Sequence, residues 1–204
     1  MFGRLKSLFG STPSKIEQVT PSIETIVKPD APFYAIGDIH GCLDLLNKLL
    51  DTIKAESAPD TPIIFLGDYV DRGRQSAQVL ARLFELNTSE PEKYICIMGN
   101  HEKMMLEFID DPLGRGARWL VNGGSDTLKS YGVTGLKTRP NVEDALDAAD
   151  ALEAAMPKGL QAWLRDLPTI WSSGNVHCVH AALDPISRLQ ANAKRLCSGG
   201  TAIS

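Results

Sequence analysis

Short apolar runs along the chain alternate with stretches in which apolar residues recur at helical spacing. Three runs, at residues 33–36, 63–66 and 94–98, have the length and composition of buried strands. Each run is followed by a stretch whose Leu, Val, Ile, Met and Phe residues are spaced to form one face of a helix. Three strand-then-helix units in succession predict an α/β fold built on a parallel sheet.

The second half of the chain has a less regular pattern. Residues 119–124 predict a helix that ends at a glycine stop, and residues 142–156 predict an acidic helix. Residues 158–166 continue as helix, and residues 176–180 predict a final strand. Because residues 11–32 are rich in Ser, Thr, Pro and Lys, we expect a leader over residues 1–31 and one domain over residues 32–204.

Each of the first three predicted strands ends in a glycine that precedes a side chain able to bind a metal ion. These side chains are Asp38, Asp68 and Asn100. The carboxyl ends of parallel strands meet at one edge of a sheet, so we expect the three side chains to converge there. For any one of them alone, a role in forming the turn is the simpler explanation. Further polar candidates follow in the chain: His40, Asp71, Arg72, His101 and His180.

These residue types limit the chemistry of the predicted site. Carboxylates, an amide oxygen and imidazoles are ligands typical of manganese, iron or zinc rather than calcium. A carboxylate such as Asp68 can bridge two ions, as in the two-metal hydrolysis of phosphate esters. Glu102 has two possible roles, as an acid in the first turn of a helix or as an outer partner of the site.

Composition excludes several other classes of protein. The chain has 204 residues, with 21 basic and 25 acidic side chains and a formal net charge of −4, which argues against a nucleic-acid-binding protein. No apolar run approaches the roughly 20 residues of a membrane span, so we expect no stable membrane insertion. The four cysteines form no C-x-x-C pair and predict reduced, buried thiols in a cytoplasmic protein.

Three sequence blocks give the pattern a family resemblance. They are Gly37-Asp38-Ile39-His40-Gly41, Gly67-Asp68-Tyr69-Val70-Asp71-Arg72-Gly73 and Gly99-Asn100-His101-Glu102. In this order and spacing they resemble the signature blocks of the phosphoprotein phosphatase family, within the metallophosphoesterase superfamily. Residues 119–124 resemble the bacterial and phage lambda branch, and His180-Ala181-Ala182 resembles a fourth block. The resemblance implies a metallophosphoesterase-type α/β/β/α sandwich.

The resemblance also implies a role for each residue. It implies that two divalent ions, manganese first and iron or zinc as alternatives, are bound, the first by Asp38, His40 and Asp68 and the second by Asp68, Asn100 and His180. Substrate phosphate would be bound by Arg72 and Asn100, while His101 would protonate the leaving oxygen and Asp71 would orient that imidazole. The phosphate would be attacked directly by a metal-bridging hydroxide, with no covalent phosphoenzyme.

By the same resemblance, the chain is a metal-dependent phosphomonoester hydrolase, with serine/threonine protein phosphatase as the leading interpretation. Its substrate would be a phosphoprotein or a small phosphorylated molecule. One alternative is a symmetrical bis(5′-nucleosyl)tetraphosphate hydrolase, because those enzymes share the early blocks. The other alternative is a weakly active or inactive phosphatase-like metal-binding protein.

The residues after Pro185 depart from the family pattern. Family members continue with a Leu-Leu-Trp segment and a terminal histidine that binds the second metal. We therefore expect a domain that is incomplete at its C-terminus, lacks its last strands and binds the second ion more weakly than the first. One hypothesis is a frameshift, because residues 196–200 can be encoded by a string that reads Leu-Leu-Trp-Gly two bases later. A natural short variant is the alternative.

Overall fold

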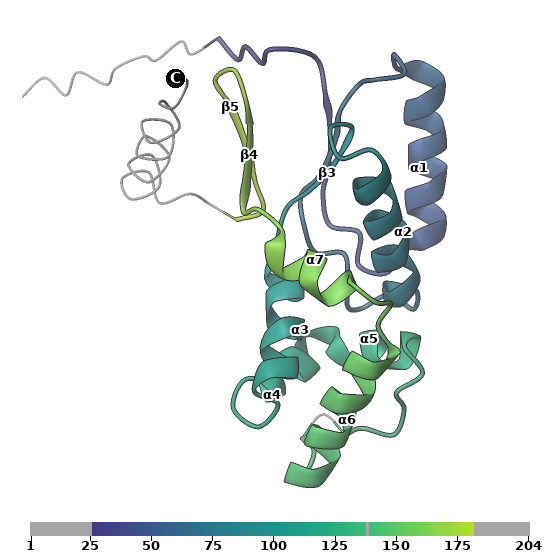
Figure 1. The fold of residues 1–204 in the computed structure, drawn as a ribbon, viewed down its shortest axis with the longest axis vertical. Coiled ribbons are helices and arrows are strands. Elements are labelled where there is room, and N and C mark those ends of the chain that lie inside the picture. The colour runs from purple at the N-terminus through teal and green to yellow at the C-terminus, as the bar shows by residue number, and fades with distance from the viewer. Residues whose placement is uncertain (1–25, 138, 182–204) are drawn as a thin grey trace, which may run out of the picture.

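The order of strands and helices in the structure follows the alternation expected from the sequence (Figure 1). A computed structural model describes residues 26–137 and 139–181. The elements of the first half are β1 (Tyr34–Ile36), α1 (Leu43–Glu56), β2 (Ile63–Phe65), α2 (Ser76–Ser89), β3 (Tyr94–Cys96) and α3 (Asn100–Asp110). Those of the second half are α4 (Gly116–Trp119), the π-helical turn η1 (Leu120–Gly124), α5 (Ser125–Ser130), α6 (Val142–Ala155), α7 (Leu160–Asp166), β4 (Ile170–Ser173) and β5 (Val176–Val179).

Strands β1, β2 and β3 form a parallel sheet in that order, which confirms the predicted α/β fold. The register aligns Ala35 with Ile64 and Ile64 with Ile95. All three residues of the central strand β2 are buried, as expected for a parallel strand covered on both faces. Helices α1 and α2 lie along one side of this sheet (Figure 1). Their buried faces supply apolar side chains to the core, among them Leu46, Ile53, Val79, Leu80 and Leu83.

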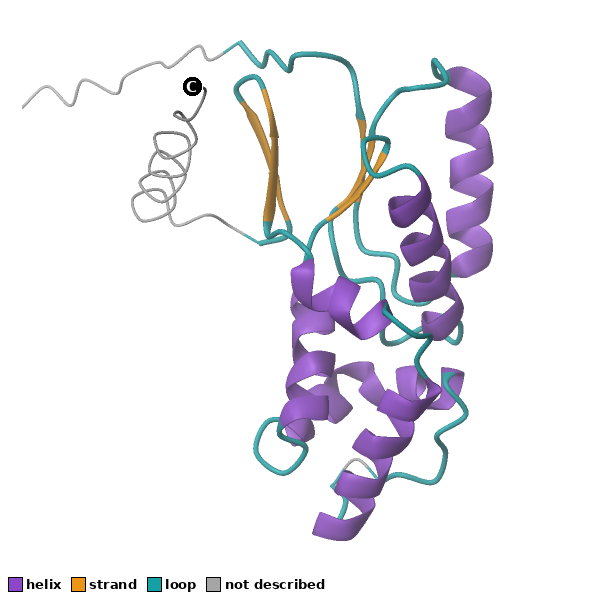
Figure 2. Cartoon of the chain, viewed as in Figure 1, coloured by secondary structure: helices purple, strands orange, loops and turns teal. Residues whose placement is uncertain are grey.

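An antiparallel hairpin, β4–β5, lies on the side of the sheet away from α1 and α2 (Figure 2). Strand β5 confirms the predicted final strand, whereas β4 had no sequence signal because Ile170 and Trp171 are followed by two serines. The hairpin matters for the site because it ends next to His180.

Residues just before β1 hydrogen-bond to the turn of this hairpin. The backbone N–H of Lys28 donates to the Asn175 side chain at 2.7 Å, and the Gly174 N–H donates to the Asp30 carboxylate at 2.7 Å. Lys28 and Asp30 lie within the predicted leader, so part of that segment is attached to the hairpin. The boundary itself stays a prediction, as does everything concerning residues 182–204, which lie outside the described residues.

The helical segment after α3 corrects one prediction. The expected glycine stop after residue 122 is wrong, because the chain runs from α4 through η1 directly into α5. Gly123 has a φ of 109° and bends the segment, but Gly124 returns to right-handed helical angles at once. The glycine pair therefore produces a bend rather than an end, and at this bend the Gly123 carbonyl accepts from the backbone N–H of Arg72 at 3.5 Å.

Helices α6 and α7 confirm the two helices expected near residues 142–166. The Asn141 side chain caps α6 by accepting from the Asp144 N–H at 2.7 Å. Among the cysteines, Cys96 is buried and Cys178 is half-buried, but the prediction is wrong for Cys42, which is exposed at the start of α1. Cys197 lies outside the described residues. Among the helices in the described ranges, none is long and apolar enough to cross a membrane.

Candidate metal centre

The loops that follow the three parallel strands carry the polar cluster predicted from the sequence. Their backbone is strained: His40, Asp68, Asp71 and Arg72 all have positive φ, at 43°, 56°, 74° and 66°. Each such residue costs on the order of 1–3 kcal/mol, and such strain concentrates at functional sites where surrounding contacts hold it. The fold therefore expends stability to point these side chains toward one another.

Glycine allows two of these loops to touch. A Cβ on Gly67, whose φ is 98°, would lie 2.5 Å from the Cα of Gly99. No side chain fits in that space, so the glycines before Asp68 and Asn100 bring the loops after β2 and β3 into backbone contact.

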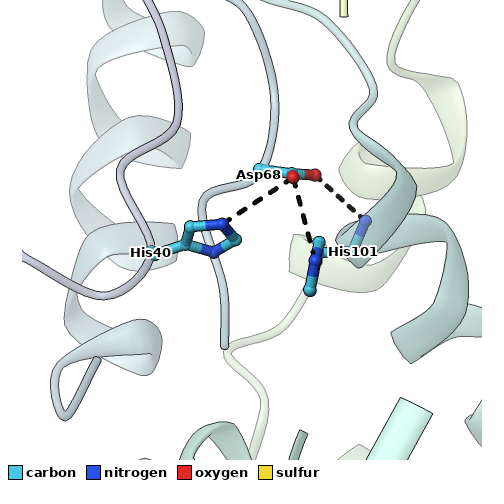
Figure 3. A group of neighbouring side chains, drawn as sticks. All are labelled: His40, Asp68 and His101. Atoms are coloured by element: carbon cyan, nitrogen blue, oxygen red, sulfur yellow. Dashed lines mark hydrogen bonds and ion pairs between the residues drawn. The ribbon is translucent and has the colours of Figure 1, made fainter. Parts of the chain in front are cut away.

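Asp68 lies at the centre of the cluster and is only 4% exposed (Figure 3). Its Oδ2 is 3.8 Å from Nε2 of His40 and 3.8 Å from Nε2 of His101. Its Oδ1 is 3.2 Å from Nε2 of His180, which arrives from the end of β5. The Asp38 carboxylate lies 3.8 Å from Nε2 of His40 on the solvent side.

These side chains form two groups that share one carboxylate. The first group is His40, Asp68 and His101, and the second is Asp38, Asp68 and His180. In each group the potential ligand atoms lie within 4.8 Å of one another, close enough to bind one ion. Asp68 is thus placed to contact an ion in either group, which is the arrangement that a bridging carboxylate requires.

Two histidines of the cluster are held in the tautomer that a metal needs. Nδ1 of His40 donates to the Val70 carbonyl at 2.7 Å, and Nδ1 of His180 donates to the Leu66 carbonyl at 2.8 Å. With Nδ1 protonated, Nε2 of each neutral imidazole presents its lone pair to the cluster. The side-chain oxygen of Asn100 adds a further oxygen ligand 2.8 Å from Nε2 of His180. Carboxylates, an amide oxygen and free imidazole nitrogens fit manganese, iron or zinc.

The Arg72 side chain lies against both sides of the centre. Its Nη1 donates to Nε2 of His40 at 2.9 Å, and its Nη2 donates to Nε2 of His101 at 3.2 Å. The planar guanidinium therefore spans the two imidazoles with an exposed edge, a geometry suited to two oxygens of a phosphate group.

His101 and Asp71 form a buried pair beside the centre. Nδ1 of His101 donates to Oδ2 of Asp71 at 2.6 Å, and the two residues are 3% and 0% exposed. Burial raises the pKa of the Asp71 carboxyl, while hydrogen bonds from Thr127 and His101 act in the opposite direction. Trp119 adds a third donor, with Nε1 lying 2.9 Å from Oδ2 of Asp71.

Glu102 turns out to occupy both of the roles left open by the sequence. It is an acid in the first turn of α3, and it is fully buried beneath the loop that carries Asp68. Its Oε1 accepts from the backbone N–H of Tyr69 at 2.7 Å and of Val70 at 3.1 Å. Its Oε2 accepts from the N–H of Asp68 at 2.9 Å and of Gly99 at 3.1 Å. Burial nevertheless raises the pKa of Glu102 to about 7.

The structure brings together every side chain that the sequence assigned to the site: Asp38, His40, Asp68, Asp71, Arg72, Asn100, His101 and His180. Their individual roles stay predictions. Nε2 of His101 lies 3.8 Å from Asp68 and could serve either as a metal ligand or as an acid, but not as both at once. Sequence reasoning missed Trp119 and Thr127 as contacts of Asp71. Trp119 belongs to the sequence block 119–124 noted above, whereas nothing in the sequence pattern around Thr127 marked it as a site residue.

Comparison with known proteins identifies the family. Residues 31–196 match the calcineurin-like phosphoesterase family. The chain is 31% identical over 152 residues to a symmetrical bis(5′-nucleosyl)-tetraphosphatase of Methylococcus capsulatus, covering 74% of this chain and 43% of that protein. It is 38% identical over 86 residues to serine/threonine-protein phosphatase PP1-delta of Caenorhabditis elegans, covering 42% of this chain and 28% of that protein.

The chain spans less than half the length of these two curated relatives. A solved structure of a protein assigned as a diadenosine tetraphosphatase aligns with a TM-score of 0.47 and 22% identity, covering 74% of this chain and 50% of that one. With a family match over most of its length, the chain belongs to the calcineurin-like phosphoesterases.

Proposed function

We propose that this chain hydrolyses phosphate esters with divalent metal ions bound around Asp68. The observation that carries the proposal is the carboxylate shared by two groups of potential ligands, with the unprotonated Nε2 of His40 and of His180 facing that carboxylate. Divalent cations at such a centre neutralise charge on the phosphoryl group during transfer. Manganese is the ion we propose first, with iron or zinc as alternatives.

The chain's own residues would divide the remaining work. Asp38, His40 and Asp68 would hold one ion, and Asp68, Asn100 and His180 the other. This division differs from the two groups described above: it pairs Asp38 with His40, 3.8 Å away, and leaves His101 free for proton transfer. Arg72 would bind two phosphate oxygens through its planar fork, with Asn100 as a further partner. His101 would give a proton to the leaving oxygen from Nε2, and Asp71 would stabilise the charged imidazole through Nδ1.

We propose phosphoserine and phosphothreonine in proteins as the substrate. The 38% identity to a serine/threonine phosphatase supports this, because that match is the stronger of the two per aligned residue. Symmetrical dinucleoside tetraphosphates are the second candidate. The match to a tetraphosphatase supports them, because it extends over 152 residues and so over the helices as well as the motif loops.

The test is turnover by chelator-treated protein reloaded with Mn²⁺. A phosphothreonine peptide and diadenosine tetraphosphate are compared as substrates, with Asp68→Asn as the disabled variant and Asp51→Asn, an exposed aspartate of α1, as its control. We expect Mn²⁺-dependent release of phosphate from the peptide by wild type and Asp51→Asn alone. Preferential cleavage of the tetraphosphate would overturn the proposal of a phosphoprotein substrate in favour of dinucleoside tetraphosphates. Failure on both, and on p-nitrophenyl phosphate, would refute the proposed activity.

A further inference from the structure

Asp71 is held by a part of the chain that contains none of the proposed ligands or phosphate contacts. Its carboxylate accepts from Trp119 in α4 and from Thr127 in α5, as well as from His101. The two helical donors are 48 and 56 residues away in sequence. Both side chains are fully buried, as is Asp71 itself. Side chains of the helical segment 116–130 therefore contact the Asp71 carboxylate, and the segment's Gly123 carbonyl accepts from the backbone N–H of Arg72 at 3.5 Å.

Thr127 contacts Asp71 in two directions at once. Its hydroxyl accepts from the backbone N–H of Asp71 at 2.8 Å and donates to Oδ1 of the same residue at 2.7 Å. Asp71 has a φ of 74°, which is unfavourable for a residue with a side chain, so its backbone needs external contacts to stay there. One hydroxyl group contacts both the backbone and the side chain of Asp71, and an aliphatic side chain of the same shape can do neither. The backbone N–H is shared with the Ser76 hydroxyl, at 3.1 Å, whereas the bond from Thr127 to Oδ1 has no such substitute from Ser76.

The consequence reaches the imidazole. Because Thr127 holds Oδ1, Oδ2 of Asp71 is presented to the Nδ1 proton of His101 at 2.6 Å. A fixed Nδ1 proton fixes the ring plane and turns Nε2 toward Asp68 and Arg72. Trp119 supports the same orientation, since its Nε1 lies within 3.1 Å of both oxygens of Asp71.

We infer that Thr127 is a positioning residue that acts on His101 through Asp71, and that Trp119 assists it. The inference rests on the proposed phosphoester hydrolysis, in which His101 delivers the proton to the leaving group. It assigns to α5 a role in the reaction rather than in packing alone. Loss of the hydroxyl should therefore harm reactions that need the proton and spare those that do not.

Two substrates separate these effects. p-Nitrophenolate leaves readily without a proton, whereas phenolate leaves poorly without one. Thr127→Val should lower kcat for phenyl phosphate by about 10–100-fold, the usual effect of removing an outer partner, and lower kcat for p-nitrophenyl phosphate much less. KM should change little for either substrate, because Thr127 does not touch the phosphate contact Arg72. Thr127→Ser keeps the hydroxyl and should restore phenyl phosphate turnover.

Ser130→Ala is the matched control on the same helix. The Ser130 hydroxyl accepts from the Ala77 N–H at 3.0 Å and donates to the Thr127 carbonyl at 2.7 Å, without touching Asp71. Ser130→Ala should weaken the packing of α5 about as much as Thr127→Val does. Any loss of kcat should be equal for phenyl phosphate and p-nitrophenyl phosphate. Equal losses on the two substrates for Thr127→Val, or no rescue by Thr127→Ser, would overturn the inference.

A second readout needs no activity. In chelator-treated, ¹⁵N-labelled protein, the Nδ1–H of His101 should give a slowly exchanging downfield proton signal, because the ring is 3% exposed. We expect Thr127→Val to shift or lose this signal, and Thr127→Ser and Ser130→Ala to keep it. An unchanged signal in Thr127→Val would contradict the positioning role. If wild type hydrolyses no phosphate ester, the proposed function fails, yet this signal still tests the contact.

Discussion

The strand-end loops and the helical segment 116–130 meet at the same site but contribute to it differently. The loops supply the proposed ligands and Arg72, on a backbone with four positive φ values. The helical segment supplies Trp119 and Thr127, which contact only Asp71 within the site. Under the proposed function, the loops would present chemical groups to an ion or a phosphate, and the helical segment would keep one of these groups in its orientation.

The difference teaches that the ligands and their supports obey different sequence constraints. A ligand must be a particular residue type in a turn after a strand, so it appears in a compact motif. A residue that supports a ligand needs only a hydrogen-bonding group at the right distance, and it can come from anywhere in the fold. Glu102 is intermediate, because it belongs to a motif yet acts as a support through four backbone N–H groups.

Removing a proposed metal ligand from the strand-end loops should have the largest effect, on the affinity for Mn²⁺. Asp68→Asn removes the carboxylate that both ligand groups share. The amide oxygen of the asparagine can still accept from the backbone N–H of His101, which lies 3.1 Å from Oδ1 of Asp68 in the wild type. Mn²⁺ affinity should fall more than about 100-fold, beyond the loss typical of an outer partner, while the unfolding midpoint changes little. Calorimetric titration with Mn²⁺ measures this, with Asp51→Asn as control. Unchanged affinity in Asp68→Asn would remove Asp68 from the centre.

The support under the ligand loop should give the next largest effect, on stability. Glu102→Gln leaves one acceptor oxygen for four backbone N–H groups, so two buried donors lose their partner. We expect a loss of about 2–6 kcal/mol in the free energy of unfolding, measured by urea denaturation. Glu107→Gln on the same helix, which removes only the pair with Arg115 on the surface, should cost less than about 1 kcal/mol. Equal urea unfolding midpoints for Glu102→Gln and Glu107→Gln would contradict the role of Glu102 in stabilising the loop that carries Asp68.

Contact between the two regions can be tested at Gly123. A Cβ at position 123 would lie 2.9 Å from the backbone nitrogen of Arg72, and the residue that carries it would have to keep a φ of 109°. Gly132 also has a positive φ, of 82°, but nothing lies within 4 Å of its added Cβ. Gly132→Ala should cost about 1–2 kcal/mol of strain alone, and Gly123→Ala should cost more.

Only Gly123→Ala should also weaken the binding of inorganic phosphate to the Mn²⁺-loaded protein, because it displaces Arg72. Equal stability losses and equal phosphate affinities in the two alanine variants would show that the helical segment does not press on the phosphate loop.

A surface ion pair outside both regions should have the smallest effect. Arg165 donates to both oxygens of Asp110 at 2.7 and 3.0 Å, and these bonds lower the pKa of that carboxyl. A lowered pKa means that the pair stabilises the fold above about pH 4 and loses that contribution as pH falls through the folded-state pKa. Because the pair is exposed, Asp110→Asn should cost less than about 1 kcal/mol at neutral pH, and this cost should shrink as the pH falls through the folded-state pKa. A cost that grows on acidification would reverse the sign of this account.

The sequence was sufficient for the parallel sheet and for the polar side chains that gather around Asp68. Both depend on local patterns: short apolar runs for β1 to β3, of which only β2 is buried at every residue, and a glycine followed by a polar side chain at the end of each run. The sequence did not predict β4, whose serines are no strand signal and whose pairing with β5 depends on the tertiary context.

The bend at Gly123 and the contacts of Thr127 with Asp71 were also beyond sequence reasoning, for a different reason. A glycine pair after a helix ordinarily marks an end, and only its neighbours show that the chain turns and continues. Thr127 is one threonine among many, and its significance comes from the carboxylate that the fold brings within 2.7 Å of its hydroxyl. Contacts between distant segments leave no mark in a single sequence.

The most direct test of the central claim is the Mn²⁺ dependence of p-nitrophenyl phosphate hydrolysis by the wild-type chain. The claim is that the strand-end loops around Asp68 form a metal-dependent centre for phosphoester hydrolysis. The account predicts that chelator treatment reduces the rate to that of buffer and that added Mn²⁺ restores it with a saturating dependence. The same rate in chelator as in Mn²⁺, or no rate at any Mn²⁺ concentration, would contradict it.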